Sequence, residues 1–534
     1  MAMSFAEMVH MNTSEYLLSK PKTKRKAIGQ FFTPVSIADY MSKMSKFSGE
    51  TVRILDPGAG GGILTACAID SLSGRGVKHF VVDLYETDEI VLPMLDNNMK
   101  MIAKELNARN MVFEYMIFQE NFISANQFAW TGLLPSEVYD VVICNPPYKK
   151  IGKDSLEAML MSDIVYGQPN LYFLFMAMGA KLLKDDGEFI YIVPRSFSSG
   201  LYFSAFRKWF LSEMRITDLH LFTSREAVAG KQDSVLQETV ILRSVRTTEP
   251  QPGIAITEST NENCDAVIGR VFIDYHTCVK NDKHSFLFFP TSEQDASTLD
   301  FVNNWTATLP ELVFRMKTGQ LVDFREREWM SQSPEANTIP LLWPFNFNGF
   351  RIRFPIQVSG KPQYLKDTLS TKRLQMARGS YLLIKRFTSK EEKRRLQCAL
   401  LLEDDLSDYD SLSAENHLNY ISKDIGVMMS EELYGIFVIL NSSYLDRYFR
   451  ILNGSTQVNA TEINSIPFPE IESIRAMGVK AMQFADLNDS ICDSIIEEQF
   501  VKQHDNTAQE AKHEQVRGSK RYSLSNRYAS SADK

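Results

Sequence analysis

Short apolar runs alternate with amphipathic stretches between residues 50 and 245. The stretch NLYFLFMAMGAKLLKDDG (170–187) has the spacing of a helix that ends at Gly187. QETVILRSV (237–245) is expected to add a late, antiparallel strand. Strands that alternate with helices indicate βαβ units, so the pattern predicts an α/β, Rossmann-like, doubly wound sheet. The remaining apolar runs each have the length of a strand: VRILDP (52–57), HFVVDLYE (79–86), MVFEYMIF (111–118), YDVVICN (139–145) and GEFIYIVP (187–194).

The alternation is lost after about residue 300. MSQSPEANTIPLLWPFNFNGFRIRFP (330–355) is rich in proline, asparagine and aromatic residues, and 431–454 is expected to form one amphipathic helix that ends at Gly454. The sequence therefore predicts five parts: a basic, helical segment at 1–28, an α/β domain at 29–248, a connector at 249–300, a mixed α+β domain at 301–475, and a C-terminal helix with a disordered tail at 476–534.

Composition places the chain among soluble proteins with more than one domain. It has 534 residues, of which 44% are hydrophobic and 23% charged. No apolar run reaches about 18 residues and the N-terminus lacks a secretory pattern, so we expect a cytoplasmic protein without a membrane span. The six cysteines are scattered and form no CxxC pair, which predicts neither a zinc site nor a disulfide framework. No metal is expected.

Net charge argues weakly against a nucleic-acid partner, because the chain carries −8 at neutral pH. Basic residues nevertheless cluster in KPKTKRK (20–26) and in IKRFTSKEEKRR (384–395). Runs of this kind form either a solvated face or a surface that contacts phosphates. Composition alone leaves both interpretations open.

A glycine-rich turn follows the first predicted strand, in ILDPGAGGGIL (54–64). Asp56 ends the strand, and the glycines, among them Gly58 and Gly60, let the backbone come close to a ligand. No Lys-Ser/Thr pair follows, so the turn is not a P-loop, and its spacing is looser than a dinucleotide fingerprint. The turn either binds a ligand or is purely structural.

The second predicted strand ends in LYETD, which places Glu86 at the same edge of the sheet. An acid there is suited to accept hydrogen bonds from both hydroxyls of a ribose, although an exposed strand-end acid can also be structural. Together, the turn and this acid describe a nucleoside cofactor held without a pyrophosphate contact. That combination favours S-adenosylmethionine over NAD.

The fourth predicted strand ends in Asn145, Pro146, Pro147 and Tyr148. Two prolines remove two backbone donors and fix two φ angles, so the loop is stiff. The Asn145 carboxamide oxygen and the Pro146 carbonyl can grip an amino group on a planar substrate. Tyr148 offers a face for stacking, which contributes about 1–3 kcal/mol. The loop therefore predicts the catalytic site of a transfer to an amino group.

These motifs, in this order, resemble the amino-methylating, S-adenosylmethionine-dependent DNA methyltransferases, and in particular the PstI/BsuBI-type modification methylases of restriction-modification systems. GQFFTP (29–34) is similar to their N-terminal cofactor motif, and 145–148 to their catalytic tetrapeptide for adenine N6. The resemblance extends through VLQETVIL (235–242) and NGSTQVNATEINSIPFP (453–469). It implies these cofactor contacts: Phe32, Thr33 and Pro34 near the methionine end, Asp56 at the amino group with Gly58 and Gly60 beside it, and Glu86 at the ribose.

The resemblance also implies that residues 301–475 recognise a DNA sequence. The expected partner is double-stranded DNA, with a separately encoded restriction endonuclease as a further partner, and we expect a monomer. The target adenine would be flipped out of the duplex and attacked directly, without a covalent intermediate. The basic residues expected at the DNA are Lys149 and Lys150 after the catalytic loop, and Lys385, Arg386, Lys390, Lys393, Arg394 and Arg395 in the second domain.

Two positions depart from the family pattern. Asn121, before Phe122, replaces the acid that contacts the cofactor adenine, and we expect its amide to hydrogen-bond the adenine instead. No aromatic residue lies in TSREAVAGKQDS (223–234), where one usually covers the second face of the target base. Phe222 is the nearest candidate for that stacking role.

Other functions remain open at this point. The same tetrapeptide occurs in enzymes that methylate protein glutamine or the guanine amino group of RNA, but these generally lack the FFTP segment and a large C-terminal region. The chain could also be a methylating subunit of a type I-like system that needs a separate specificity subunit. A third alternative is a degenerate, DNA-binding regulator.

Overall fold

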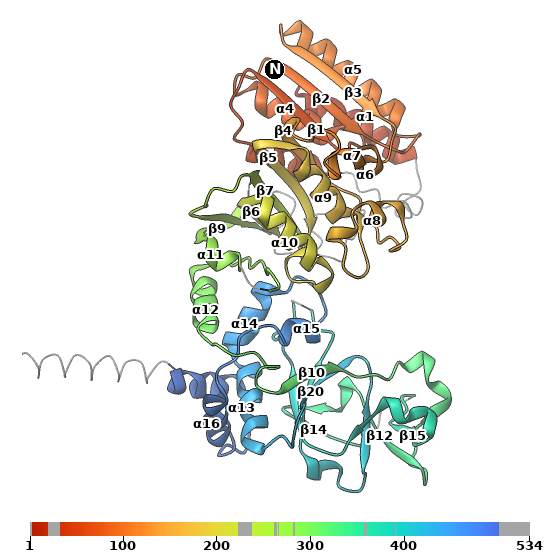
Figure 1. The fold of residues 1–534 in the computed structure, drawn as a ribbon, viewed down its shortest axis with the longest axis vertical. Helices are drawn as coiled ribbons and strands as arrows, with labels where there is room; N and C mark the ends of the chain where they lie inside the picture. Colours follow the sequence, from red (N-terminus) through yellow and green to blue (C-terminus); the bar gives the residue numbers. More distant parts are fainter. Residues whose placement is uncertain are drawn as a thin grey trace, which may run out of the picture. The chain divides into compact units, whose positions relative to one another are not determined.

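The protein divides into two compact units in the computed structural model (Figure 1). The first comprises Met1–Leu299 with Ile451–Ser455, and the second Asp300–Arg450 with Thr456–Lys534. The predicted basic run 20–26, Phe32, the stretch 223–234, Lys390 and the predicted tail lie outside the described residues. The structure describes residues 3–19 (side chains to residue 13), 33–222, 238–260, 264, 266–280, 283–356, 360–389 and 391–500.

Within its described residues, the first unit contains one nine-stranded sheet with the order β3-β2-β1-β4-β5-β7-β6-β8-β9. Strands β3, β2, β1, β4 and β5 are parallel, and β7 runs antiparallel to both β5 and β6, as the sequence predicts for this late strand. The predicted doubly wound sheet is confirmed. The strands are β1 (Thr51–Asp56), β2 (His79–Tyr85), β3 (Val112–Phe118), β4 (Tyr139–Cys144), β5 (Leu183–Pro194), β6 (Met214–Phe222), β7 (Thr239–Arg246), β8 (Gly253–Ser259) and β9 (Val267–Asp274).

Helices cover both faces of this sheet (Figure 1). Successive strand residues point to opposite faces, so Ile54 joins one apolar core and Leu55 the other. Helices α1 (Phe5–Ser19), α3 (Val35–Met44), α4 (Ile63–Ser73) and α5 (Leu92–Ala108) contribute to the first core. The second core contains residues of α6 (Phe122–Ala125), α7 (Gln127–Trp130), α9 (Leu171–Lys181), α10 (Ser204–Glu213) and α11 (Tyr275–Cys278). A further short helix, α8, comprises Leu156–Leu160.

Two predicted boundaries in the first unit are wrong. Helix α9 ends at Lys181, and Gly187 lies inside β5, where a Cβ would come within 2.8 Å of the Lys184 carbonyl oxygen. The predicted connector 249–300 instead supplies β8 and β9, which extend the sheet because β8 pairs in parallel with β6. These strands are 7 and 8 residues long, but they follow the polar, proline-containing stretch TTEPQPG (247–253), which favours a connector.

The second unit is a mixed α+β domain, as predicted. Its described residues form a six-stranded sheet, β10-β20-β17-β18-β14-β13, and a five-stranded sheet, β11-β15-β12-β19-β16. The strands are β10 (Phe314–Thr318), β11 (Met330–Ser331), β12 (Thr338–Leu342), β13 (Phe347–Asn348), β14 (Arg351–Ile352), β15 (Tyr364–Lys366), β16 (Gln375–Ala377), β17 (Tyr381–Lys385), β18 (Cys398–Leu401), β19 (Ser411–Ala414) and β20 (Leu418–Lys423). The helices are α12 (Glu293–Asn303, which spans the division), α13 (Ser430–Asn441), α14 (Ser443–Leu452), α15 (Ala460–Ile463) and α16 (Ile471–Ala481).

The single helix predicted at 431–454 is in fact two helices. Ser442 has an extended backbone (φ −72°, ψ 153°) that ends α13, and its Oγ accepts a hydrogen bond from the amide of Leu445 at 3.1 Å in α14. A serine cap therefore interrupts the amphipathic pattern. The predicted domain 301–475 is interrupted as well, because Ile451–Ser455 belong to the first unit. Arg195 of the first unit donates a hydrogen bond to the carbonyl of Ile451.

A buried ion cluster joins α13, α16 and β20 in the second unit. Glu432 is fully buried and accepts from Lys423 Nζ at 2.9 Å and from Arg475 Nη2 at 2.8 Å. Burial alone would raise the pKa of Glu432, but these two hydrogen bonds outweigh burial and hold the pKa below its usual range. The cluster fixes the helix pair to the sheet.

No helix in the described part of the chain is long and apolar enough to cross a membrane. Across the same residues, no group of three or more His, Cys, Asp or Glu side chains is arranged to hold a metal ion.

Candidate functional site

The strand order reverses between β1 and β4, and ligands of doubly wound sheets bind at the carboxyl ends of such strands. β1 ends at Asp56 and β4 ends at Cys144, so the glycine-rich turn and the Asn145 loop start side by side. A Cβ at Gly58 would lie 3.5 Å from the Asn145 carbonyl oxygen. A methyl group at Gly58 would thus be in ordinary van der Waals contact with the Asn145 loop, which shows how close the two loops lie.

Glu86 ties the end of β2 to the glycine-rich turn. Its Oε2 accepts from the amide of Gly60, which has φ +52°, at 3.0 Å, and its Oε1 accepts from the amides of Thr87 at 2.7 Å and Asp88 at 2.8 Å. Burial raises the pKa of Glu86. A carboxylate has about four acceptor positions, so Glu86 is oriented by the backbone and still able to accept from a ligand.

A second layer of side chains supports the turn from behind. Asn98 of α5 donates to the carbonyl of Gly61 at 2.8 Å, and Asn12 of α1 donates to Asn98 Oδ1 at 3.0 Å. Asn98 is fully buried. Neither asparagine lies at a strand end or in a motif, so no sequence signal marks either of them.

Asp56 lies behind the turn and does not line the cavity in front of it. It is fully buried, and its Oδ2 accepts from Thr65 Oγ1 at 2.9 Å. Burial raises the pKa of Asp56 to about 7, against the opposing effect of hydrogen bonds from Thr65 and Gly58. The Asp56 carboxyl therefore changes charge near neutral pH. The nearby Glu86 carboxylate contributes to the rise of the Asp56 pKa through charge repulsion.

A cavity of about 600 Å³ opens at these strand ends, a size that suits a nucleoside-like ligand. Residues proposed from the sequence that line it are Gly58, Gly60, Glu86, Asn121, Phe122, Asn145, Pro146, Pro147 and Lys149. Further lining residues without a sequence signal include Tyr85, Ile90, Glu120, Glu157, Leu171 and Phe175.

The Asn145 carboxamide is held in one orientation. Its Nδ2 donates to Thr33 Oγ1 at 3.1 Å, and the following residue, Pro34, precedes the first turn of α3. This bond fixes the rotation of the amide and hence the direction of its oxygen. The structure thereby joins the N-terminal TP pair to the Asn145 loop, which are 112 positions apart in the sequence.

Tyr148 is likewise fixed. Its hydroxyl donates to the carbonyl of Ile192 at 2.9 Å, and its ring meets Tyr172 edge-on with centroids 6.2 Å apart. The ring is half-buried, and burial of the hydroxyl raises the pKa of Tyr148. Phe222 differs, since it is only 2% exposed and packs edge-on against His220. The predicted stacking role of Phe222 is therefore wrong for this structure, because burial leaves its ring no open face.

Asn121 uses its amide inside the protein. Its Oδ1 caps α6 by accepting from the amides of Ile123 at 3.0 Å and Ser124 at 3.2 Å. Its Nδ2 donates to Glu157 Oε1 at 2.8 Å. The Asn121 oxygen and one N–H are therefore engaged within the protein, and only the second N–H is left for the predicted contact with the cofactor adenine.

The basic run of the second unit is divided between interior and surface. Arg395 is 1% exposed and donates to Thr388 Oγ1 at 3.1 Å. Arg394 donates to the carbonyls of Leu440 at 3.3 Å and Ser442 at 3.0 Å. Both arginines hold the domain together, so their predicted DNA contacts are wrong.

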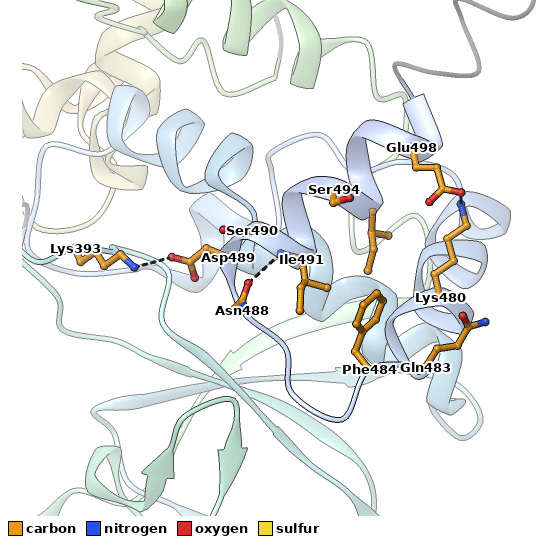
Figure 2. Close-up of a pocket in the computed structure, with 11 residues that line it drawn as sticks. Lys393, Lys480, Gln483, Phe484, Asn488, Asp489, Ser490, Ile491, Ser494 and Glu498 are labelled. Atoms are coloured by element: carbon orange, nitrogen blue, oxygen red, sulfur yellow. Dashed lines mark hydrogen bonds and ion pairs between the residues drawn. The ribbon is translucent and has the colours of Figure 1, made fainter.

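Lys393 lies at the edge of a cavity of about 750 Å³, shown in Figure 2. Its Nζ pairs with Asp489 at 3.3 Å, and Lys480 on the other side pairs with Glu498 at 2.9 Å. Asn488 Oδ1 accepts from the amide of Ile491 at 3.0 Å. Both lysines of this cavity are therefore paired with carboxylates of the protein itself.

Lys385 lines a different hollow of about 420 Å³ in the second unit. Trp343 and Phe345 stack there with centroids 5.8 Å apart, and Lys361 Nζ lies 4.7 Å from the Trp343 ring. Phe387 is 42% exposed and lies beside His417. The other polar residues of the hollow are Asp323 and Glu415, and Arg386 lies over the Phe387 ring at 5.5 Å.

Comparisons with known proteins match most of the chain. The family model described as the Eco57I restriction-modification methylase matches residues 23–228. Type II methyltransferase M.PstI of Providencia stuartii is 31% identical over 485 residues, which cover 89% of this chain and 93% of the relative. Type II methyltransferase M.BsuBI of Bacillus subtilis is 31% identical over 473 residues, 86% of this chain and 92% of the relative. The cryoEM structure of a DrdV–DNA complex covers 89% of this chain and 59% of that chain, with 11% identity and a TM-score of 0.48.

Proposed function

The chain belongs to the type II restriction-modification methyltransferases, and on that premise we propose that it methylates N6 of adenine in double-stranded DNA. The methyl donor is S-adenosylmethionine. The target adenine is flipped out of the duplex into the first unit's cavity. The second unit reads the DNA sequence.

The first unit's cavity fits the methyl donor by its size and its donor set. Glu86 keeps about one acceptor position for a ribose hydroxyl, and Gly58 and Gly60 line the cavity at the turn. Asp56, behind the turn, would attract the ammonium group of the cofactor once ionised. When bound, the cofactor supplies an electrophilic methyl group.

The orientation of Asn145 by Thr33 is the observation that carries this function. With its amide rotation fixed, the Asn145 oxygen and the Pro146 carbonyl form a rigid pair of acceptors for one amino group. Hydrogen bonds from N6 to this pair draw its lone pair out of conjugation with the ring. The nitrogen would then attack the methyl carbon directly as the carbon–sulfur bond breaks, which releases S-adenosylhomocysteine, and N6 would lose one proton to solvent. Positioning by the two acceptors would supply much of the rate.

Tyr148 stacks on the flipped base and helps offset the cost of flipping, which is a few kcal/mol. Its hydroxyl bond to Ile192 keeps the ring from turning away. Tyr148 is half-buried, and it lies in the chain between Pro147 and Lys149, which both line the cavity. No other aromatic ring is assigned to the second face of the base.

We expect the DNA to contact exposed cations and aromatic rings of the protein. Lys149 and Lys150 are exposed directly after the catalytic loop, where the flanking strand would pass. In the second unit, the hollow with Lys361, Lys385 and Phe387 combines cations with an exposed ring, which suits a nucleic acid. Asp323 in the same hollow pairs with Lys361 at 2.9 Å and can accept a further hydrogen bond from a base amino group, whereas Glu415 is buried and paired with His417.

The test uses the purified full chain, methyl-labelled S-adenosylmethionine and duplex DNA of mixed sequence. After digestion to nucleosides, label is expected in N6-methyldeoxyadenosine. Label in another nucleoside would contradict the adenine assignment. Label that appears only after a second protein is added would favour a subunit that depends on a separate specificity subunit.

A further inference from the structure

Glu157 lines the first unit's cavity, and the proposed reaction gives it no role. It lies on α8 and is half-buried. We propose that Glu157 recognises the amino group of the cofactor's adenine, and that Asn121 positions it for this contact. The inference rests on the proposed function, because it assumes that S-adenosylmethionine occupies this cavity.

The bond between Asn121 and Glu157 sets the direction of the carboxylate. Asn121 Nδ2 donates to Glu157 Oε1 at 2.8 Å, while its own oxygen is used by two amides at the start of α6. The amide cannot rotate without losing three hydrogen bonds. Asn121 therefore orients the Glu157 carboxylate, and its own oxygen is not available to a ligand.

The backbone under Glu157 is also fixed. Ser155 caps α8 by accepting from the amide of Ala158 at 3.4 Å, and Ala158 is 2% exposed. A side chain held at both ends in this way is pre-organised for binding, which lowers the entropy lost when a ligand arrives.

The surroundings suit a purine. Phe122, Leu171 and Phe175 give the cavity an apolar wall next to Glu157, and a flat base can lie against such a wall. The exocyclic amino group of adenine is a donor and needs an acceptor at its edge. An ionised carboxylate only accepts, and its hydrogen bonds are about twice as strong as neutral ones.

Glu120 is the competing acceptor in the same cavity. It is exposed, and the described residues give its side chain no hydrogen bond that would orient it. Glu120 carries the same kind of charge and lines the same cavity, so Glu120→Gln is the matched control for loss of one negative charge.

The experiment measures the affinity of the full-length protein for S-adenosylhomocysteine and for S-inosylhomocysteine, which carries a 6-oxo group in place of the amine. Wild-type protein is expected to prefer the amino compound. Glu157→Gln should lose about tenfold affinity for it, the effect of one charge-assisted hydrogen bond. The same variant should bind the 6-oxo compound relatively better, because the glutamine amide can donate to the oxo group.

Two further variants, Asn121→Ser and Glu157→Ala, separate recognition from folding, with Glu120→Gln as the control. Asn121→Ser keeps a helix-capping oxygen but removes the donor to Glu157, so the preference for the amino compound should fall about threefold. Glu157→Ala should abolish the preference without reversing it. Glu120→Gln should weaken both ligands equally and leave the ratio of affinities unchanged.

An unchanged ratio in Glu157→Gln, or an equal change in Glu120→Gln, would overturn the inference while leaving the proposed function intact. Wild-type protein that binds neither compound would overturn the proposed function and this inference with it. Circular dichroism of each variant confirms that the fold is kept, and the affinity ratio is a readout that a merely structural role would not move.

Discussion

The cavity of the first unit and the basic run of the second unit are both marked clearly in the sequence. In the structure, the residues of the first lie together, whereas those of the second lie apart. The motif residues of the first unit lie at the ends of β1, β2 and β4, and they meet at one edge of the sheet. The basic residues of the second unit separate, with Arg395 in the interior and Lys393 at the surface.

The difference follows from the geometry of the two folds. Parallel strands bring all their carboxyl ends to one edge, so a motif after a strand has a known location. In the second unit, Lys385 ends a strand, and the loop after it turns back to place Arg394 and Arg395 against α13 and α14. A strand-end motif thus predicts position, whereas a run of like charges predicts only composition.

The largest expected effect tests the cavity side of this comparison. Asn145→Ala should lower the rate of methyl transfer on the order of 10³-fold, because it removes one of two fixed acceptors at the reacting amine. Affinity for S-adenosylhomocysteine should change little. Single-turnover assays and calorimetry measure the two quantities separately. A loss of ligand affinity equal to the loss of rate would show that Asn145 shapes the cavity instead of contacting the target.

A second prediction concerns the charges that hold the second unit together. Glu432→Ala leaves Lys423 and Arg475 without their buried partner, and should destabilise the second unit by about 3–5 kcal/mol. Thermal unfolding followed by calorimetry should show the loss. Glu472→Ala, at an exposed position on α16, is the control and should cost less than about 0.5 kcal/mol. Equal effects of the two substitutions would contradict the structural role of the cluster.

The aromatic hollow gives a prediction for the surface side. Phe387→Ala should weaken DNA binding about tenfold if its exposed ring stacks on a base. Phe484, 45% exposed in the cavity of Figure 2, is a matched control, and Phe484→Ala should leave DNA affinity unchanged. Fluorescence anisotropy at fixed salt measures both. A larger loss with Phe484→Ala would move the DNA contact to the other cavity.

The smallest expected effect is the pH dependence of cofactor binding. The pKa of Asp56 is raised to about 7, so its carboxyl is mostly protonated at about pH 6 and mostly ionised at about pH 8. The ionised form attracts the ligand's ammonium group, and affinity for S-adenosylhomocysteine should rise up to about tenfold across this range. Asp56→Asn should flatten the profile, as calorimetry at several pH values would show. An unchanged profile in this variant would assign the titration to another group, with Glu86 the nearest candidate.

The sequence by itself determined the parallel part of the sheet and the place of the site. Apolar runs of strand length, each followed by a turn, are a local property, and the carboxyl-edge rule then places Asp56, Glu86 and Asn145 together. The motifs that resemble the methyltransferases lie at those same strand ends. For this reason the predicted fold class was confirmed, and eight of the thirteen predicted catalytic and cofactor-binding residues line one cavity.

Only the tertiary structure decided how the individual side chains are used. The strands β8 and β9 exist because β6 offers an edge to pair with, and no local pattern marks that edge. The link from Asn121 to Glu157 crosses 36 positions, and the link from Asn145 to Thr33 crosses 112. Burial of Phe222 and Arg395 depends on what packs over them. Such contacts depend on distance in space, which a sequence does not state.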